Sequence, residues 1–220
     1  MKGRLITAKM IAGFKEHLIL EERSAATIQK YIRDVKAFAK YARLCQAAQR
    51  RHNERLNLIL QTICGTGIRV SELQFITVEA AKCGEAVVRC KGKTRTVFLV
   101  KALRQKLLRY AAKQNIQSGM IFVTRTGKPI SRTNIWREMK ALCVEADVNP
   151  QKVFPHNLRH LFARVFYGIE KDIANLADIL GHSSINTTRI YNLHRHGTPP
   201  PDGNYAPDPM IKAAHSAAGT

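Results

Sequence analysis

His156 and Arg159 lie one helical turn apart in FPHNLRHLFA, so a helix there would carry an imidazole and a guanidinium on one face. This pair suits an oxyanion or a phosphate, because a guanidinium donates two parallel hydrogen bonds to such a group. His156 and His160 also have the spacing of the zinc-binding HExxH motif, but Asn157 stands where that motif needs its glutamate. The segment therefore indicates an anion site and not a zinc protease.

Other polar side chains stand out along the chain, and each has an ordinary alternative. An arginine after a glycine turn is most often a solvated surface charge, and a lysine in a hairpin turn is most often simply exposed. A histidine at a helix end can be a cap, and a tyrosine can be a core aromatic with its hydroxyl at the surface. The residues concerned are Arg69, Lys91, His182 and Tyr191.

The chain is strongly basic, with 36 Lys and Arg against 16 Asp and Glu in 220 residues, a net charge of +20. Residues 1–160 hold 31 of the basic and 11 of the acidic side chains, whereas residues 161–220 hold five of each. A folded chain with this surface favours a polyanionic partner, because each neutralised phosphate releases counterions. Nucleic acid is the commonest such partner, and a basic protein of ribosomal character is the alternative.

Five cysteines form no Cys-x-x-Cys pair and are odd in number, which predicts neither a disulfide framework nor a zinc site. A reducing cytoplasm fits this pattern. No apolar run approaches the roughly 20 residues that cross a bilayer. Charges interrupt the apolar residues of the N-terminal segment, so no signal peptide and no membrane association are expected.

The elements that must position these residues are mostly helical. Amphipathic patterns predict helices over 5–20 and 24–42, and a third over 53–64 that ends at Gly65-Thr66-Gly67, with a short helix at 69–73. Alternating patterns over 85–90 and 94–100 predict a hairpin with the cationic tip Lys91-Gly92-Lys93. A basic helix over 101–114, a strand over 120–124 and a helix from the Ser131 cap to about 146 follow.

The last third is also expected to be helical. Pro155 suits a helix start, and Gly181 suits the end of a helix over 172–180. Ser183 or Ser184 would start a final short helix that presents Tyr191, and the Pro-, Gly- and His-rich segment from Leu193 is typical of a disordered tail. The fold class expected is α+β, mostly helical, with a small antiparallel sheet.

Five strings occur in one order between Asn53 and Tyr191, and together they resemble the tyrosine recombinase (phage integrase) family. They are GTGIRVSEL, VVRCKGKTRTVFL, FPHNLRHLFA, LADILGHSS and INTTRIY. The resemblance implies a catalytic domain that cuts and rejoins DNA strands at specific sites, without metal or cofactor, through a covalent tyrosine intermediate.

The resemblance also implies a role for each site residue. Tyr191 would attack the scissile phosphate and form a 3′-phosphotyrosyl link, while Arg69 and Arg159 would bind the non-bridging oxygens. His156 would help to take the tyrosine proton and His182 would orient the phosphoryl group. Lys91, before the turn glycine, would protonate the leaving 5′-oxygen; Lys93, two residues on, is the alternative.

The partners implied are double-stranded DNA and further copies of the chain, four on two duplexes. Lys93, Arg95 and Arg132 are the expected DNA contacts outside the reacting group. A mobile element or prophage is the expected origin. Two other functions stay open: a DNA-binding remnant without productive recombination, and relaxation of DNA as by a type IB topoisomerase.

Three parts are expected: partial core-binding helices of SAM-like type over 1–45, the catalytic domain over 46–192 and the tail over 193–220. Relatives of this family have two more helices and a linker where this chain has about ten residues, so weakened DNA binding and poor recombination are expected. Relatives also follow the tyrosine with a docking helix. Here HRHGTPPPDG follows, and a frameshift soon after Tyr191 is the hypothesis for it.

Overall fold

The computed structural model describes residues 6–90, 92–182 and 184–188. Within these ranges the fold is mostly helical, with one two-stranded antiparallel sheet, which confirms the expected fold class. No helix in the described part of the chain is both long enough and apolar enough to cross a membrane. The tail over 193–220 lies outside the described residues.

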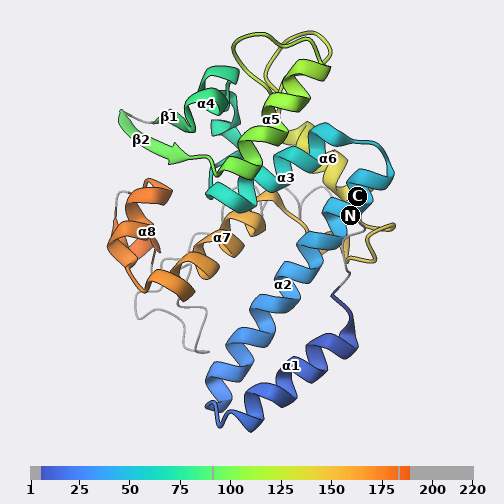
Figure 1. The fold of residues 1–220 in the computed structure, drawn as a ribbon, viewed down its shortest axis with the longest axis vertical. Coiled ribbons are helices and arrows are strands. Elements are labelled where there is room, and N and C mark those ends of the chain that lie inside the picture. Colours follow the sequence, from blue (N-terminus) through green and yellow to red (C-terminus); the bar gives the residue numbers. More distant parts are fainter. Residues whose placement is uncertain (1–5, 91, 183, 189–220) are drawn as a thin grey trace, which may run out of the picture.

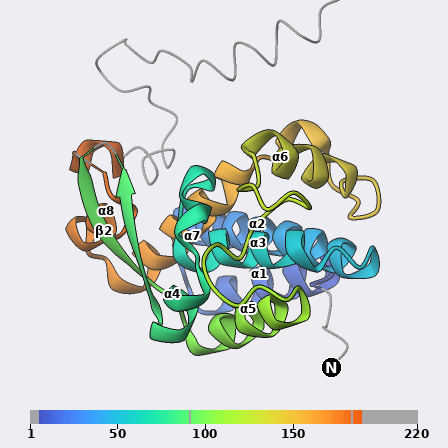
Figure 2. The same ribbon diagram turned by 90° about the horizontal axis from the view of Figure 1, so that it is seen from above.

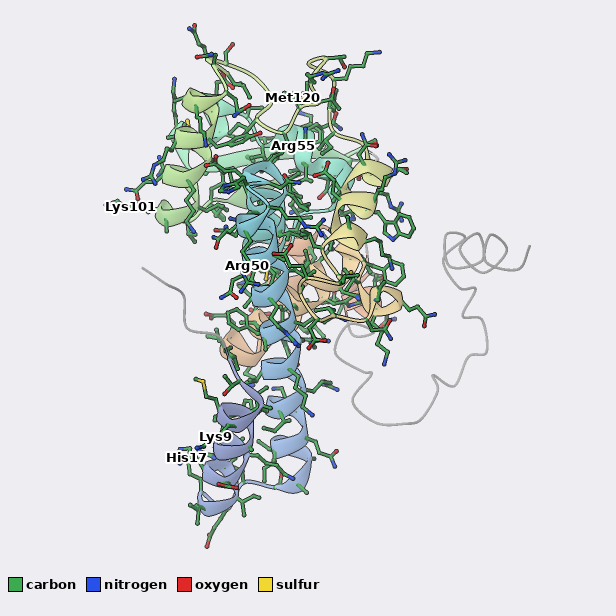
Figure 3. The ribbon with its side chains drawn as sticks, turned by 90° about the vertical axis from the view of Figure 1, so that its right-hand side faces the viewer. Lys9, His17, Arg50, Arg55, Lys101 and Met120 are labelled. Carbon is green, nitrogen blue, oxygen red and sulfur yellow. The ribbon has the colours of Figure 1, made fainter. Side chains whose placement is uncertain are left out.

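Helices α1 (Ala8–Leu20) and α2 (Ala25–Arg50) pack side by side and form an arm that projects from the rest of the molecule (Figure 1). The hydroxyls of Thr7 and Ser24 cap their N-termini. In Figure 3, Lys9 and His17 mark α1 on this arm, and the exposed Arg50 marks the other end of α2, beside the rest of the molecule.

The predicted end of the second helix at residue 42 was wrong, because α2 continues to Arg50. Leu44, Ala47 and Ala48 extend its apolar stripe and are at most 2% exposed. Arg51 is the C-cap of this helix, and His52 adopts a left-handed conformation with φ of 52°. The ten residues expected to connect two modules are therefore mostly helix, packed on the body.

Helix α3 (Glu54–Thr66) runs through the core (Figures 1 and 2). It packs between α2, α5 (Lys101–Lys113), α6 (Arg132–Ala141) and α7 (Pro155–Glu170). Its predicted buried residues Leu56, Ile59, Leu60 and Ile63 are at most 1% exposed, which confirms the predicted stripe. Arg55, labelled in Figure 3, donates to the Val123 carbonyl at 3.0 Å and to Glu138 at 2.8 Å. This arginine joins α3 to two later segments.

The predicted hairpin is confirmed as β1 (Glu85–Cys90) and β2 (Lys93–Phe98), paired from Glu85 with Phe98 to Cys90 with Lys93. Strand β2 ends two residues earlier than expected, because Val100 is already the N-cap of α5 (Lys101–Lys113). A short helix that was not expected, α4 (Val78–Cys83), precedes the hairpin. Before it lies the 3₁₀ turn η1 (Val70–Phe75), where a short helix was expected.

The strand expected over 120–124 is absent as a ladder. Its residues make two isolated bridges, Thr77 with Met120 and Val123 with Pro129. Neither bridge extends into a ladder. Thr77, the partner of Met120, is the N-cap of α4, so the chain continues there as a helix. Between Val123 and Pro129 the chain turns back at Gly127, whose φ is 75°. Helix α6 (Arg132–Ala141) starts at the Ser131 cap as predicted, but it ends before residue 146 in turns that expose Val144 to 87%.

Helix α7 (Pro155–Glu170) begins at Pro155, as predicted, after the 3₁₀ turn η2 (Pro150–Lys152). An ion pair between Arg164 of α7 and Asp34 of α2, 3.0 Å apart, fastens α7 to the arm. Helix α8 (Ile173–Leu180) follows and lies beside β2 (Figure 2). Gly181 ends it with φ of 63°, and residues 185–188 form a further helical turn.

Candidate active site

Three arginines from different elements donate to three consecutive carbonyls at the end of α8. Arg95 of β2 donates to the Ile179 oxygen at 2.6 Å, and Arg159 of α7 donates to the Leu180 oxygen at 2.6 Å. Arg69, at the start of η1, donates to the Gly181 oxygen at 3.2 Å. The last carbonyls of a helix lack partners within it and form the negative end of its dipole, so they attract cations. The end of α8 thus assembles a cluster of three guanidinium groups.

Glu72 of η1 holds two of these arginines from the opposite side. Its carboxylate accepts from the Arg69 backbone N–H at 2.8 Å, from Arg69 Nη1 at 2.7 Å and from Arg95 Nη2 at 2.6 Å. Burial of this carboxylate, whose side chain is 2% exposed, would raise its pKa. The hydrogen bonds from Arg69 and the charge of Arg95 outweigh burial, so the pKa of Glu72 is lowered and the carboxylate stays charged.

Two glycines leave the room that the cluster needs. Gly181 has φ of 63°, and a Cβ there would lie 2.6 Å from Arg95 Cδ. Gly67 has φ of 66°, and a Cβ there would lie 2.5 Å from a ring carbon of Phe162. Both positions combine a left-handed backbone with a close approach, and glycine satisfies both conditions. This is the physical reason for Gly67 in GTGIRVSEL and for Gly181 in LADILGHSS.

Arg159 is enclosed to a degree that the sequence did not suggest. Its side chain is 2% exposed, and Nη1 donates to the Gly67 carbonyl while Nη2 donates to the Leu180 carbonyl. Nη2 also lies 3.2 Å from Nε2 of His182. In this state the guanidinium joins the end of α3, α7 and the end of α8, and a phosphate would have to compete with these partners.

His182 follows directly after the glycine that ends α8. Its Nδ1 lies 2.8 Å from Oγ1 of Thr188, a residue with no exposed surface. Burial lowers the pKa of His182 to about 4, and the positive charges of Arg159, Arg69 and Arg95 act in the same direction. The imidazole is therefore neutral at physiological pH.

His156 lies in the first turn of α7 and is exposed, unlike Arg159 one turn later. Its ring meets that of His160 edge to face, with centroids 4.4 Å apart and an interplanar angle of 81°. An electrostatic interaction between His156 and His182 also contributes to the lowered pKa of His182. The structure thus brings together four of the six predicted site residues: Arg69, His156, Arg159 and His182.

The other predicted residues have different positions. Lys91 and Tyr191 lie outside the described residues, as does the side chain of Lys93. Arg132 is exposed and lines a pocket of about 170 Å³ with Val70 and Phe122. The role of each of these residues stays a prediction.

The DNA contact expected at Arg95 stays a prediction, and in this structure the side chain is mostly buried. Its side chain is 11% exposed and points inward to Glu72 and to the Ile179 carbonyl. The hairpin register accounts for this orientation, because Arg95 pairs with the buried Val88 and thus lies on the inner face. Its guanidinium holds the cluster together in this state.

Two residues of the site were missed from the sequence, Glu72 and Thr188. Glu72 stands three residues after Arg69, a spacing that places a carboxylate and a guanidinium within reach in one turn. This spacing is a signal for the ion pair that the sequence alone carries. Thr188 carries no comparable signal, because its neighbour Thr187 is exposed while Thr188 is buried, and the sequence does not separate the two.

The model of the phage integrase family matches residues 37–197, which is most of the chain. The chain belongs to this family. The match includes every residue predicted for the site. It begins inside α2, so the first part of the arm lies outside the matched region.

Similar curated proteins are tyrosine recombinases. XerH of Campylobacter jejuni is 35% identical over 145 residues, which is 62% of this chain and 40% of that protein. XerA of Pyrococcus furiosus is 26% identical over 224 residues, 86% of this chain and 77% of that protein. The chain spans about half the length of most of the curated relatives that it matches.

Solved structures show the same fold at lower identity. A crystal structure of XerA recombinase covers the whole chain with a TM-score of 0.60 at 23% identity and is itself covered to 86%. XerH bound to its difH substrate in a pre-cleavage complex matches with a TM-score of 0.59 at 20% identity, over 70% of this chain and 48% of that one. A lambda integrase tetramer bound to a Holliday junction matches with a TM-score of 0.57 at 18% identity, over 90% of this chain and 67% of that one.

Proposed function

We propose that this chain is a site-specific DNA recombinase that cleaves and rejoins strands through a 3′-phosphotyrosyl intermediate. The observation that carries the proposal is the cluster of Arg69, Arg159 and His182 at the end of α8, with His156 beside it. A DNA phosphate gains negative charge as a nucleophile attacks it. Fixed guanidinium groups stabilise such charge, because they are oriented before the reaction starts.

The arginines would act first, by exchanging some partners for the non-bridging oxygens of the scissile phosphate. Arg69 is the more accessible of the two, with a side chain 35% exposed, and Glu72 orients it. Arg159 would turn Nη2 from His182 toward the phosphate while Nη1 keeps the Gly67 carbonyl. Two guanidinium groups would then face one phosphate at right angles to the attacking and leaving oxygens.

Proton transfer would accompany attack and departure. Tyr191 would attack the phosphorus, and His156, exposed at the start of α7, would help to take its proton. Lys91 would give a proton to the leaving 5′-oxygen, with Lys93 as the alternative at the same hairpin tip. The phosphotyrosyl bond conserves the energy of the broken linkage, so a 5′-hydroxyl can reverse the step and join strands.

We propose double-stranded DNA and further copies of the chain as partners. The net charge of +20 supports a DNA duplex, and relatives of the same fold have been solved on DNA, among them lambda integrase as a tetramer on a Holliday junction. The domain division proposed is 46–192 for catalysis and 1–45 for DNA binding, although α2 crosses this boundary as one helix. The reducing cytoplasm is the proposed compartment, supported by five cysteines without a disulfide.

Strand exchange tests the proposal. Binding sites are first selected from a pool of duplexes with randomised sequence, and two selected duplexes of different length are then incubated with the protein. The proposal predicts recombinant lengths with the wild type and none with Tyr191→Phe. Binding without any cleavage would identify a DNA-binding protein, and relaxation of one supercoiled duplex without exchange would identify a topoisomerase-like activity. Either result would refute the recombinase assignment.

A further inference from the structure

His182 lies between two groups that differ in what they can donate and accept. Nε2 faces Arg159 Nη2 at 3.2 Å, and a guanidinium only donates hydrogen bonds, so Nε2 is the acceptor. The single proton of the neutral ring is therefore on Nδ1, which donates to Oγ1 of Thr188 at 2.8 Å. In this state Nε2 presents a lone pair to the guanidinium cluster and not an N–H.

With a phosphate bound, Nε2 must donate a hydrogen bond, whereas in the free state it accepts one. Phosphate oxygens are acceptors, so once Arg159 turns Nη2 to a phosphate, a lone pair on Nε2 would face other lone pairs. Nε2 then needs a proton. A second proton on the ring is disfavoured by burial and by the surrounding arginine charges. The ring can stay neutral if Nδ1 loses its proton as Nε2 gains one.

That exchange leaves Nδ1 in need of a donor, and Thr188 has one. A hydroxyl both donates and accepts, whereas a carbonyl only accepts and a backbone amide only donates. Rotation of the hydroxyl proton would let Oγ1 accept from Nδ1 in one state and donate to it in the other. Thr188 is fully buried, in the helical turn over 185–188, which keeps it beside the ring.

We infer that Thr188 is a positioning residue that lets His182 move its ring proton from Nδ1 to Nε2 when a phosphate occupies the guanidinium cluster. One proton leaves Nδ1 and one arrives at Nε2, by way of solvent, so the ring charge does not change. The inference rests on the proposed function, because it takes the ligand of the cluster to be the phosphate of DNA. It adds a residue to the site and a reason for its hydroxyl.

Nitrogen NMR of histidine-labelled protein tests this inference without a DNA substrate, because protonated and unprotonated ring nitrogens differ in ¹⁵N chemical shift. The probe is inorganic phosphate, and a His182→Asn variant assigns the His182 signals. We expect a proton on Nδ1 in the free wild type and on Nε2 at saturating phosphate. Thr188→Ser should behave in the same way, and Thr188→Val, without a hydroxyl, should keep the proton on Nδ1. Thr187→Val is the matched control, since that threonine is exposed.

Three results would overturn the inference: a wild-type ring that does not change with phosphate, a ring that carries both protons, or a Thr188→Val variant that responds as the wild type does. A second arm measures the rate of covalent complex formation on a selected DNA site. Loss of one hydrogen bond in the reacting state lowers a rate by about tenfold, and this is the expected effect of Thr188→Val but not of Thr187→Val. If no variant forms a complex, the proposed function fails, and the NMR arm still decides the role of Thr188.

Discussion

The substitution Glu72→Gln should destabilise the protein by about 3 kcal/mol, the lower end of the cost of removing one partner from a buried ion pair. Glutamine has nearly the same shape, but it is neutral, and its amide nitrogen cannot accept from an arginine. Arg95, 11% exposed, would keep a buried charge with the Ile179 carbonyl. Arg69 is 35% exposed and can turn to water, which is why the lower end of the range applies.

Urea and thermal unfolding followed by circular dichroism measure this loss. For a chain of this size, about 3 kcal/mol corresponds to a fall in Tm of about 6–12 °C. Glu54→Gln is the matched control, because Glu54 and Lys113 form an ion pair 2.8 Å long whose side chains are 38% and 66% exposed. That change should cost less than about 1 kcal/mol. Equal losses for the two variants would refute the assignment of Glu72 as the group that holds the cluster.

Two further predictions concern the glycines and the imidazole. In urea unfolding, Gly67→Ala should destabilise the protein by about 2–4 kcal/mol, because the new Cβ would combine a left-handed backbone with a clash against Phe162. Gly65→Ala is the control, since Gly65 lies in α3 and a Cβ there would meet no atom within 4 Å, and this change should be neutral or stabilising by up to about 1 kcal/mol. A larger loss of stability for Gly65→Ala than for Gly67→Ala would contradict the reasoning. The pKa of His182 is lowered to about 4 from 6.5, chiefly by burial, so the unfolded chain takes up a proton between these values that the folded protein does not. The stability that neutral His182 contributes is complete above pH 6.5 and is lost as the pH falls toward 4. After discounting for the half-exposed ring, the wild type should lose about 1 kcal/mol more than His182→Asn between pH 7 and pH 5, and parallel pH profiles would show that this pKa is not depressed.

The sequence predicted the fold best where a single residue type or a regular spacing of apolar residues determines the local structure. Ser131 and Pro155 start their helices, and Gly181 ends one, because capping and left-handed backbone are properties of single residues. The alternation over 85–90 predicted a strand of the hairpin, because a period of two residues is typical of a strand with one buried face. The segment over 120–124 shows the opposite case, because its buried apolar run makes only two isolated bridges, to Thr77 and to Pro129, and no continuous ladder.

The site was predictable as a set of residues and not as a set of contacts. The motif strings pointed to Arg69 and Arg159, but their partners, the carbonyls at the end of α8, lie about a hundred and about twenty residues away in the chain. Backbone acceptors carry no sequence signal, since every residue has a carbonyl. The Arg95 side chain points inward because of the hairpin register. The cationic run at the hairpin tip is compatible with more than one register, so the sequence did not predict this orientation.

Covalent capture on DNA tests the central claim most directly. A selected duplex carries a 5′-bridging sulfur at the cleavage position, so that the strand cannot be rejoined, and the reaction contains EDTA. The account predicts an adduct that resists detergent with the wild type and is absent with Tyr191→Phe, and peptide mass spectrometry should find the nucleotide on Tyr191. Arg159→Lys should reduce its formation by at least about a hundredfold, as loss of a charge-stabilising donor does. An adduct on another residue, or one that forms equally well with Tyr191→Phe, would contradict the account.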